Sequence, residues 1–552
     1  MKRVREDATH HGQSYKLRRV SAHTHLFVLS EEILVRILSF VPVPTLLVCQ
    51  LICKKLGRLA VDSELWKAAF YTRFVMPRAA RIPGIKETHS QHLRYSSKLS
   101  KWLHDSHLLQ HGRKINWKHQ YRLRHNWSKG SCAISEITVA QPPSDLPLLV
   151  VMSDRAIYTA DAVLGLRAWS SKDGQDFIAA APPFSRMPTG LPRSPTSITI
   201  DKSEGCGAYE RVVVGFADGS FMVFALALYE KVFEMLFAHP PSTSGALTAL
   251  AYSSPHLLSM THDHLLSIYA FSESHRSNQT TLMAPKLLYS LKSHTIWAPA
   301  SLSIRSTSTA MIAAIAYALP TYLSGWTIGI QEMRISLEGD LLESRLATAS
   351  EVQSCTLSDQ PSPSSTAIRS SSSFISGTRD ALRVDPSVVS KPTSMSYSHP
   401  YLLVAHPDNT LALYLVKSTN SVLSISSGSR LWGHTSSVSG THVGSRGKAV
   451  SVSRLGDELR VWDLESGIAS KDCRRQISGG RISVRVKPAK DNEGNSDEDA
   501  ALSPKHSLRL ALDKGFDDST ISKGWVGFDE QNVIVLREKS EGSQVLVVHD
   551  FS

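Results

Sequence analysis

Apolar and polar positions follow two different periods along this chain of 552 residues. Between Leu29 and Phe70, apolar side chains recur every three or four residues, which is typical of amphipathic helices. From about residue 131 onward they alternate in short runs bounded by turn residues, which is typical of strands. The pattern therefore predicts a small helical module followed by a much larger all-β domain.

The helical stretch predicts three short helices. Ser30 is a suitable N-cap for the first helix, which Pro42 and Pro44 then end. Thr45 and Asp62 are the candidate N-caps of the second and third helices. The apolar positions at helical spacing are Ile33, Leu34, Ile37, Leu38 and Val41 in the first helix, Val48, Leu51, Ile52, Leu56 and Leu59 in the second, and Leu65, Trp66, Ala69 and Phe70 in the third. So small a module buries little surface alone, so we expect a partner or a neighbouring domain to cover its remaining apolar face.

The order of these residues resembles the F-box, the adaptor-binding motif of cullin-type SCF ubiquitin ligases. The resemblance rests on Glu31-Glu32-Ile33-Leu34, Ile37-Leu38, Ile52-Cys53-Lys54 and Leu65-Trp66, whereas Ser30, Thr45 and Leu56 depart from the usual pattern. It implies that a Skp-family adaptor binds here, through Leu29, Ile33, Leu34, Ile37, Leu38, Leu46, Ile52, Leu65 and Trp66. The alternative is an ordinary buried helical hairpin.

Residues 71–130 are strongly basic, with thirteen lysines and arginines and two acidic residues. His104, His107 and His111 share a helical face, but three positions spanning seven residues cover about 10.5 Å, so one zinc ion cannot bind all three. The stretch 117–130 resembles the segment before the first blade in F-box proteins with WD repeats. The resemblance implies a helix anchored by Trp117, Tyr121, Arg122, Asn126 and Trp127. A surface that stacks single-stranded RNA is the competing interpretation.

Seven stretches of the C-terminal part share one pattern, an apolar strand, a turn and a second apolar strand. Four of the turns contain an aspartate, namely Asp154, Asp218, Asp263 and Asp408. The other stretches are 313–330, 449–467 and 524–551. Val461-Trp462-Asp463, together with the upstream Gly433-His434, resembles a WD repeat. The resemblance implies a β-propeller, and seven repeats are enough to close its ring. A β-sandwich or two smaller β domains are the alternative.

The predicted fold is therefore a small all-α F-box module followed by an all-β propeller, expected to have seven blades, with long loop insertions. The repeats lie roughly 45 to 80 residues apart, further than the usual period of about 40 to 45, which predicts the insertions. The expected domains are a disordered basic tail 1–25, the F-box 26–75, a basic helical connector 76–130 and the propeller 131–552, with disordered insertions at about 343–392 and 486–505.

Charge and cysteine content indicate the cellular setting of the protein but do not identify a ligand. The net charge is +12, and basic clusters at Lys2-Arg3 and in 16–19 resemble a two-part nuclear import signal, so we expect a nuclear or cytoplasmic location, or both. Six irregularly spaced cysteines predict reduced thiols, and Cys49 with Cys53 lacks a second ligand pair for a metal. The sequence contains no run of eighteen apolar residues, so it predicts no membrane-spanning helix.

The sequence carries no recognisable catalytic motif. It contains no Walker-type phosphate loop, nucleophile elbow or dinucleotide fingerprint, so we expect no catalytic residues, no cofactor and no bound metal. The resemblance implies a receptor subunit that binds its adaptor directly, meets a cullin and a RING subunit indirectly, and presents a target protein of unknown identity. Arg155, Arg454 and Arg460 are the candidate target-binding residues. A WD-repeat scaffold outside any ligase and a nuclear RNA-associated propeller using 71–130 are the rival hypotheses.

Overall fold

The computed structural model divides at Arg124/His125 into two compact units, and this boundary falls within helix α8 (Trp117–Lys129). The predicted tail 1–25, the three histidines between 104 and 111, and most of both predicted insertions lie outside the described residues. The described residues are 26, 29–76, 115–140, 148–172, 176–184, 193–202, 209–276, 279–293, 296–307, 310–321, 325–336, 339–349, 390–444, 447–454, 458–464, 483–488, 524–538 and 544–552.

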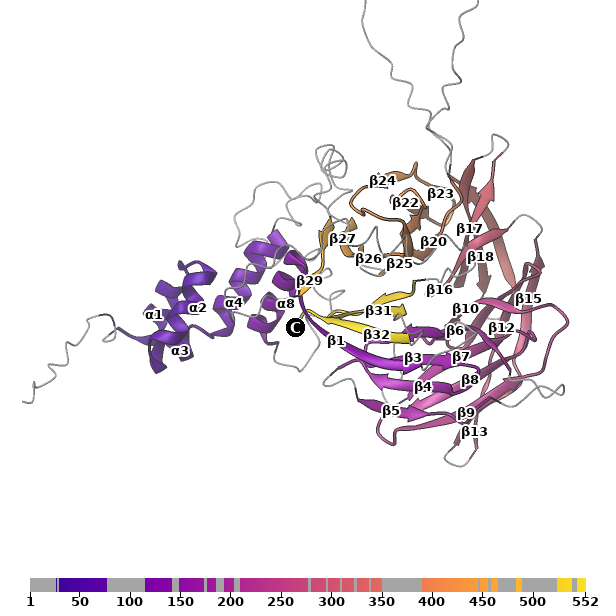
Figure 1. Ribbon diagram of the computed structural model, residues 1–552, viewed down its shortest axis with the longest axis horizontal. Helices are drawn as coiled ribbons and strands as arrows, with labels where there is room; N and C mark the ends of the chain where they lie inside the picture. Colours follow the sequence, from indigo (N-terminus) through magenta and orange to yellow (C-terminus); the bar gives the residue numbers. More distant parts are fainter. Residues whose placement is uncertain are drawn as a thin grey trace, which may run out of the picture. The chain divides into compact units, whose positions relative to one another are not determined.

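The first unit is helical, and its helices are short (Figure 1). They are α1 (Glu31–Leu38), α2 (Val43–Ile52), α3 (Lys54–Leu59), α4 (Ser63–Phe70) and the π-helical turn η2 (Tyr71–Val75). One apolar cluster joins α1 to α4, η2 and the first turns of α8. Because no single helix here has more than one buried face, the unit is stable only when all of them pack together.

The helix boundaries confirm part of the sequence analysis and correct the rest. Ser30 and Asp62 occupy the N-cap positions of α1 and α4, and the Asp62 side chain accepts a hydrogen bond from the amide of Glu64 at 2.9 Å. Thr45 is not an N-cap, because α2 begins two residues earlier, at Val43. The predicted second helix is two helices, since Cys53 is extended and separates α2 from α3.

The described residues of the second unit form seven sheets that are each built around four antiparallel strands, and one two-stranded sheet (Figure 1). Blade 1 consists of β2 (Leu149–Met152), β3 (Ala156–Asp161), β4 (Gly165–Ser170) and β5 (Phe177–Ala180); blade 2 of β6 (Pro195–Ile200), β7 (Tyr209–Phe216), β8 (Phe221–Ala227) and β9 (Val232–His239); and blade 3 of β10 (Leu247–Ser253), β11 (His256–Thr261), β12 (Leu265–Ala270) and β15 (Lys286–Lys292). A separate hairpin, β13 (Glu273–Arg276) and β14 (Gln279–Leu282), lies between β12 and β15 in the chain.

Blades 4 to 7 repeat this order, and the predicted seven-bladed propeller is confirmed. Blade 4 consists of β16 (Trp297–Ser306), β17 (Ala310–Pro320), β18 (Trp326–Ser336) and β19 (Leu341–Thr348); blade 5 of β20 (Ser394–Ser398), β21 (Tyr401–Ala405), β22 (Leu411–Ser418) and β23 (Leu423–Ile425), with β24 (Ser429–Leu431) also on β22; blade 6 of β25 (Val438–Val443), β26 (Lys448–Ser453), β27 (Leu459–Asp463) and β28 (Ser483–Arg485); and blade 7 of β30 (Val526–Phe528), β31 (Asn532–Glu538), β32 (Gln544–Asp550) and β1 (Ser131–Ala140). The short β29 (Lys487–Pro488) runs parallel to β1.

Two of these strands correct the predicted insertions. Residues 343–348 belong to β19, so the serine-rich insertion begins after this strand. Residues 487 and 488 form β29, which pairs with β1 from Ser131↔Lys487. Both stretches are included in sheets because their backbone groups find partners there.

The first strand of the propeller completes its last sheet. β1 pairs antiparallel with β32 from Ala133↔Asp550 to Ala140↔Gln544, and Figure 1 shows these two strands side by side. Val139, Ile534 and Leu546 then share one buried cluster with Val150 and Ile157 of blade 1. Strand pairing and core packing therefore close the ring at the same place, which removes the exposed sheet edges that an open array would leave.

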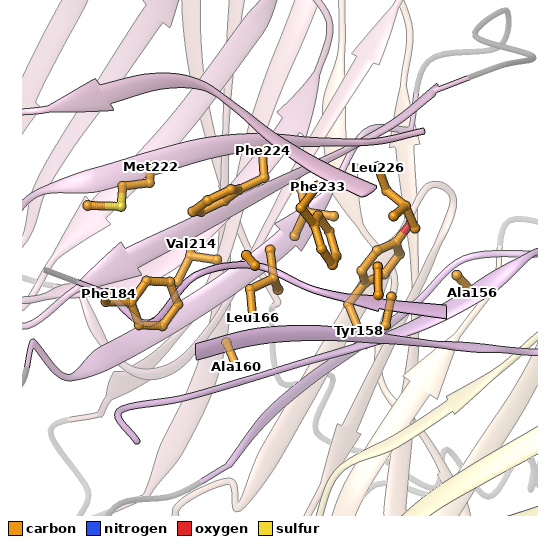
Figure 2. Close-up of a cluster of buried hydrophobic side chains, with 14 of the residues drawn as sticks. Ala156, Tyr158, Ala160, Leu166, Phe184, Val214, Met222, Phe224, Leu226 and Phe233 are labelled. Carbon is orange, nitrogen blue, oxygen red and sulfur yellow. The ribbon is translucent and has the colours of Figure 1, made fainter. Parts of the chain in front are cut away.

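Buried side chains fill the space between consecutive blades. Figure 2 shows the cluster between blades 1 and 2, where Tyr158 and Leu166 of blade 1 face Phe224 and Phe233 of blade 2. Similar clusters join blades 2 and 3, 3 and 4, 4 and 5, and 5 and 6. Each sheet is buried on the faces that meet its neighbours, which explains why strands such as β8 are apolar at nearly every position.

The turn between the second and third strands has the same left-handed backbone geometry in three blades. In blade 2 the Asp218 carboxylate accepts a hydrogen bond from the Ser220 amide at 3.0 Å, and the next residue, Gly219, has φ +76°. His264 and Asn409 follow the equivalent aspartates with φ +60° and +64°. The position after the aspartate is therefore left-handed, a conformation that glycine adopts freely and that asparagine and histidine adopt more readily than most other residues. We call the end of the ring that carries these turns the second-hairpin end.

Asp154 does not belong to this set of turns. It lies between β2 and β3, the first and second strands of blade 1, whereas the equivalent of Asp218 in blade 1 is Asp161, between β3 and β4. The Asp161 carboxylate accepts hydrogen bonds from the amides of Val163 and Leu164. Because successive hairpins of an antiparallel sheet lie at opposite ends, Asp154 lies at the opposite end, here called the first-hairpin end.

Candidate binding surfaces

The predicted adaptor-binding residues divide into a buried group and an exposed group. Leu34, Leu38, Leu46, Leu65 and Trp66 are all buried in the apolar cluster of the first unit. The indole of Trp66 also donates a hydrogen bond to the carbonyl of Ala60 at 2.8 Å. These five side chains cannot be the contact surface as predicted, because their atoms already pack inside the unit. Their role is to hold the helices together.

The exposed group lies on α1 and α2. Ile33 and Ile37 are 49% and 42% exposed, Ile52 is 61% exposed, and Leu29 is half-buried against the core. Leu51 has 86% of its surface exposed, although its spacing places it on the predicted inner face. Other large apolar side chains exposed in this unit are Leu26, Phe40, Leu47, Val48 and Val61. A small unit with this much exposed apolar surface has the composition of a protein-binding surface.

Sequence periodicity could not identify these residues on α2. Its sequence, VPTLLVCQLI, contains only two polar side chains, Thr45 and Gln50. Nearly every position is apolar, so spacing does not distinguish the buried face from the exposed one. Only Leu46 of this helix is buried. The signal that was available is the unusually apolar character of the whole helix, which predicts two covered faces.

The predicted anchors of α8 are divided between the two units. Trp117 and Tyr121 belong to the apolar cluster of the first unit, where the Tyr121 ring lies edge-on to Trp66 with centroids 5.5 Å apart. The hydroxyl of Tyr121 accepts a hydrogen bond from Arg73 at 2.7 Å. These contacts fix the start of α8 within the helical unit and cover the rings of both aromatic residues.

The end of α8 packs within the propeller unit. The indole of Trp127 donates to the carbonyl of Glu530 at 2.9 Å, and Asn126 donates to the carbonyl of Phe551 at 2.9 Å. Lys448 lies over the Trp127 ring, 4.0 Å from its centroid. The helix therefore leads directly into β1 through Gly130, whose φ of +70° and close approach to the Arg485 carbonyl exclude a side chain.

Arg122 is not an anchor. Its side chain is exposed, and it makes no hydrogen bond or ion pair with the residues that the structure describes. The burial of Trp117, Tyr121 and Trp127 also weakens the RNA interpretation of this segment, because buried rings offer no face for stacking a base.

Comparison with known proteins follows this division into helices and propeller. The family described as F-box protein pof12 beta-propeller matches residues 132–552, and the family described as F-box-like matches residues 31–72. The chain belongs to the pof12 β-propeller family of F-box proteins. The propeller match covers most of the chain, and the helical match coincides with α1 to α4.

One curated relative and several solved structures resemble this F-box protein. The F-box protein pof12 of Schizosaccharomyces pombe (strain 972 / ATCC 24843) is 44% identical over 64 residues, which are 12% of this chain and 14% of that protein. The solved structures include the WD40 β-propeller domain of Doa1, with a TM-score of 0.34, 14% identity and coverage of 75% of this chain and 97% of that one. The structure of U3-55K has a TM-score of 0.39 and 10% identity, and the match covers 76% of this chain and 98% of that one. The structure of the RRP9 WD40 repeats has a TM-score of 0.37 and 10% identity, and the match covers 76% of this chain and 99% of that one.

The three candidate target-binding arginines of this F-box protein do not form one site. Arg155 lies at the first-hairpin end of blade 1, whereas Arg454 lies exposed at the second-hairpin end of blade 6. Arg460 lies within β27, where its Nε donates to Glu458 at 2.8 Å and its Nη1 donates to Ser483 at 3.1 Å. Asp154 and Arg155 lie in a first hairpin, not in the turn that contains Asp218 or Asp408, so Arg155 and Arg454 lie at opposite ends of the ring, and a role of these arginines in target binding stays a prediction.

The WD-like stretch of blade 6 forms a buried hydrogen-bond network in the pof12-type propeller. Ser451 accepts a hydrogen bond from the Trp462 indole at 2.7 Å and lies 2.5 Å from Nε2 of His434. The Glu458 carboxylate accepts two bonds from Thr435, both at 2.9 Å. Burial alone would raise the pKa of Glu458. The hydrogen bonds from His434 and Thr435 lower it by more than burial raises it, so the pKa of Glu458 lies below its ordinary value. The network ties the start of blade 6 to its second and third strands.

The described residues contain no group of three or more histidine, cysteine or acidic side chains placed to hold a metal ion. None of the helices described for this F-box protein has the length and apolar content required to cross a membrane.

Proposed function

We propose that this F-box protein is the substrate-recognition subunit of an SCF-type cullin ubiquitin ligase. The exposed apolar side chains of α1 and α2 bind a Skp-family adaptor, and the propeller binds the target protein. The single observation that carries the proposal is the exposure of Ile33, Ile37, Leu51 and Ile52 within the unit that matches the F-box-like family. Cullin and RING subunits then join through the adaptor.

The chemistry of ubiquitin transfer belongs to other subunits in this proposal. The contribution of the F-box protein is to hold the target near a ubiquitin-charged enzyme, which raises the effective concentration of the reacting groups. Large exposed aliphatic side chains suit the adaptor contact, because their burial supplies roughly 25 cal/mol for each Å² of apolar surface removed from water.

Adaptor binding by the full-length protein tests the first half of the proposal. Leu51→Asp and Ile52→Asp each place a charge on the exposed surface without disturbing the core, so we expect the Kd for a purified Skp-family adaptor to rise at least about 30-fold. Isothermal titration calorimetry measures the Kd. Ser63→Asp, an exposed substitution in the first turn of α4, is the matched control and should leave the Kd unchanged.

Two outcomes separate this proposal from its rivals. If the wild-type protein does not bind the adaptor at micromolar concentration, the proposal is wrong. If it binds the adaptor but no cullin co-purifies with the pair, a scaffold outside the ligase is the better explanation. Co-purification of cullin with the wild type, and its loss with Leu51→Asp, supports the ligase assignment.

A further inference from the structure

Two tryptophans form an aromatic pair on blade 4, in which Trp297 is exposed and Trp326 is half-buried. Trp297 is the first residue of β16 and Trp326 is the first residue of β18. Their ring centroids lie 6.2 Å apart with the planes at 82°, and 48% of the Trp297 surface is exposed. Burying one such indole on binding would contribute more energy than most other side chains can, which makes exposed tryptophans typical centres of binding surfaces.

This pair lies at the second-hairpin end of the propeller. Trp326 directly follows the turn between β17 and β18. Trp297 is the first residue of β16, the first or inner strand of blade 4, which starts at the same end. Inner strands of neighbouring blades start together, since Thr393 before β20 donates to the carbonyl of Val438 in β25 at 2.8 Å. The starts of β16, β20 and β25 therefore belong to one end of the ring.

Exposed cations lie along the same end. Lys391, in the segment that leads into β20, has its ammonium group 5.4 Å from the centroid of the Trp326 ring. Arg454 is exposed at this end of blade 6. The described acids at this end of blades 4 to 6 already have partners: Asp408 pairs with Arg430 at 3.2 Å, and Glu458 is buried beside Arg460. The described part of this surface is therefore aromatic and positively charged.

We propose that Trp297, Trp326 and Lys391 bind an extended acidic segment of a partner protein. An apolar side chain of the segment packs against the two indoles, and its aspartate or glutamate carboxylates face Lys391 and Arg454. The partner is the ligase target, so this role rests on the function proposed above. Because the two indole planes lie at 82°, they do not offer parallel faces to successive bases. The two described cations of this surface suit the carboxylates of a protein segment better than a nucleic-acid backbone, whose binding requires many phosphate contacts.

A displayed library of random 16-residue peptides, selected on the immobilised full-length protein, tests this surface. We expect the enriched peptides to contain acidic residues around an apolar residue. Fluorescence anisotropy then measures one synthesised peptide on each variant. Trp297→Ala should weaken its binding at least about tenfold, and Lys391→Glu should weaken it and reduce its salt dependence. Tyr229→Ala, which alters a side chain with 88% exposure at the first-hairpin end, is the control and should bind like the wild type.

The contrary results are equally specific. The proposal is wrong if no peptide is enriched, if the enriched peptides lack acidic residues, or if Trp297→Ala and Tyr229→Ala bind equally well. It is also wrong if a 20-nucleotide single-stranded RNA, and not a peptide, binds in a Trp297-dependent way. Adaptor binding by Trp297→Ala should match the wild type. Failure of the adaptor assay would therefore overturn the ligase role, and with it the partner's identity as a ligase target, but not the peptide-binding surface. Loss of peptide selectivity with adaptor binding intact would overturn this surface alone.

Discussion

Trp127 stacks face to face on Phe551, with ring centroids 4.2 Å apart and ring planes 12° apart. The first of these residues lies in the last turn of α8, and the second is the penultimate residue of the chain. Phe551 is completely buried, and its carbonyl accepts a hydrogen bond from Asn126. The beginning and the end of the propeller unit thus share one small aromatic core beside the pairing of β1 with β32.

Removal of either ring should destabilise the closed propeller. We expect Trp127→Ala and Phe551→Ala each to lower the free energy of unfolding by about 3 to 5 kcal/mol, because each leaves a cavity in a packed core. The double variant should lose less than the sum, by about 0.5 to 1.5 kcal/mol, since the stacking contact is lost only once. Urea denaturation followed by circular dichroism measures these values. Strict additivity would show that the two rings do not stabilise each other.

Glu332 links blades 4 and 5 and should be the most sensitive charged residue among those described there. Its fully buried carboxylate accepts hydrogen bonds from Arg305 at 2.9 Å, Arg345 at 3.3 Å and Ser418 at 2.6 Å. Glu332→Gln leaves two guanidinium groups without that charge, so we expect a loss of about 3 to 5 kcal/mol in denaturant unfolding. Glu343→Gln, at a carboxylate with 40% side-chain exposure, should cost less than about 1 kcal/mol. Equal costs would contradict this role.

His549 should make the stability of the propeller depend on pH. Burial and, to a smaller extent, Arg537 lower the pKa of His549 from 6.5 to about 4. The folded protein therefore keeps this imidazole neutral between pH 6.5 and 4, whereas the unfolded chain binds a proton, so stability falls as the pH falls through this window. We expect the titration of His549 to make the free energy of unfolding about 1 to 2 kcal/mol lower at pH 5 than at pH 7.

The control for this prediction is His549→Gln, which cannot titrate. The difference between the pH profiles of wild type and variant isolates His549 from other groups, including Asp529, whose pKa burial raises to about 6 and whose effect has the opposite sign. Thermal unfolding between pH 5 and 7 measures both profiles. Parallel profiles would contradict the expected role of this histidine.

The buried and exposed groups of the F-box should respond differently to substitution. Leu34→Ala removes a core side chain, so we expect a loss of about 2 to 5 kcal/mol and a fall in helical content. Ile37→Asp changes an exposed side chain, so folding should be preserved while adaptor binding is lost. Circular dichroism and adaptor titration, measured on the same preparations, separate the two effects. Loss of fold in Ile37→Asp would show that this residue belongs to the core.

Local patterns were sufficient to predict the architecture. Alternation with a period of two predicted strands at all seven repeats, and the change of period near residue 131 placed the start of the β part at β1. The Glu31 to Trp66 order was enough to indicate an F-box, which the family match supports. These patterns can be recognised in the sequence because each depends on residues that lie close together in the chain.

The binding surfaces were less accessible to sequence analysis. On α2, an almost wholly apolar sequence hid the difference between buried Leu46 and exposed Leu51. In blade 1, Asp154 and Asp161 both follow an apolar strand, so the sequence pattern does not show that Asp161, and not Asp154, forms the turn equivalent to that of Asp218. The pairing of Trp297 with Trp326 joins residues separated by a whole hairpin, and spacing alone gave no reason to connect them.

The sequence by itself determined which segments are helices or strands and that the β part consists of repeats, because hydrophobic period and turn chemistry act over a few neighbouring residues. Only the tertiary structure decided that β1 completes the sheet of β32, that Trp127 meets Phe551, and which apolar side chains remain exposed. These features depend on contacts between distant parts of the chain. A local pattern specifies two faces of a strand or helix, but the packed neighbours decide which face is covered and by what.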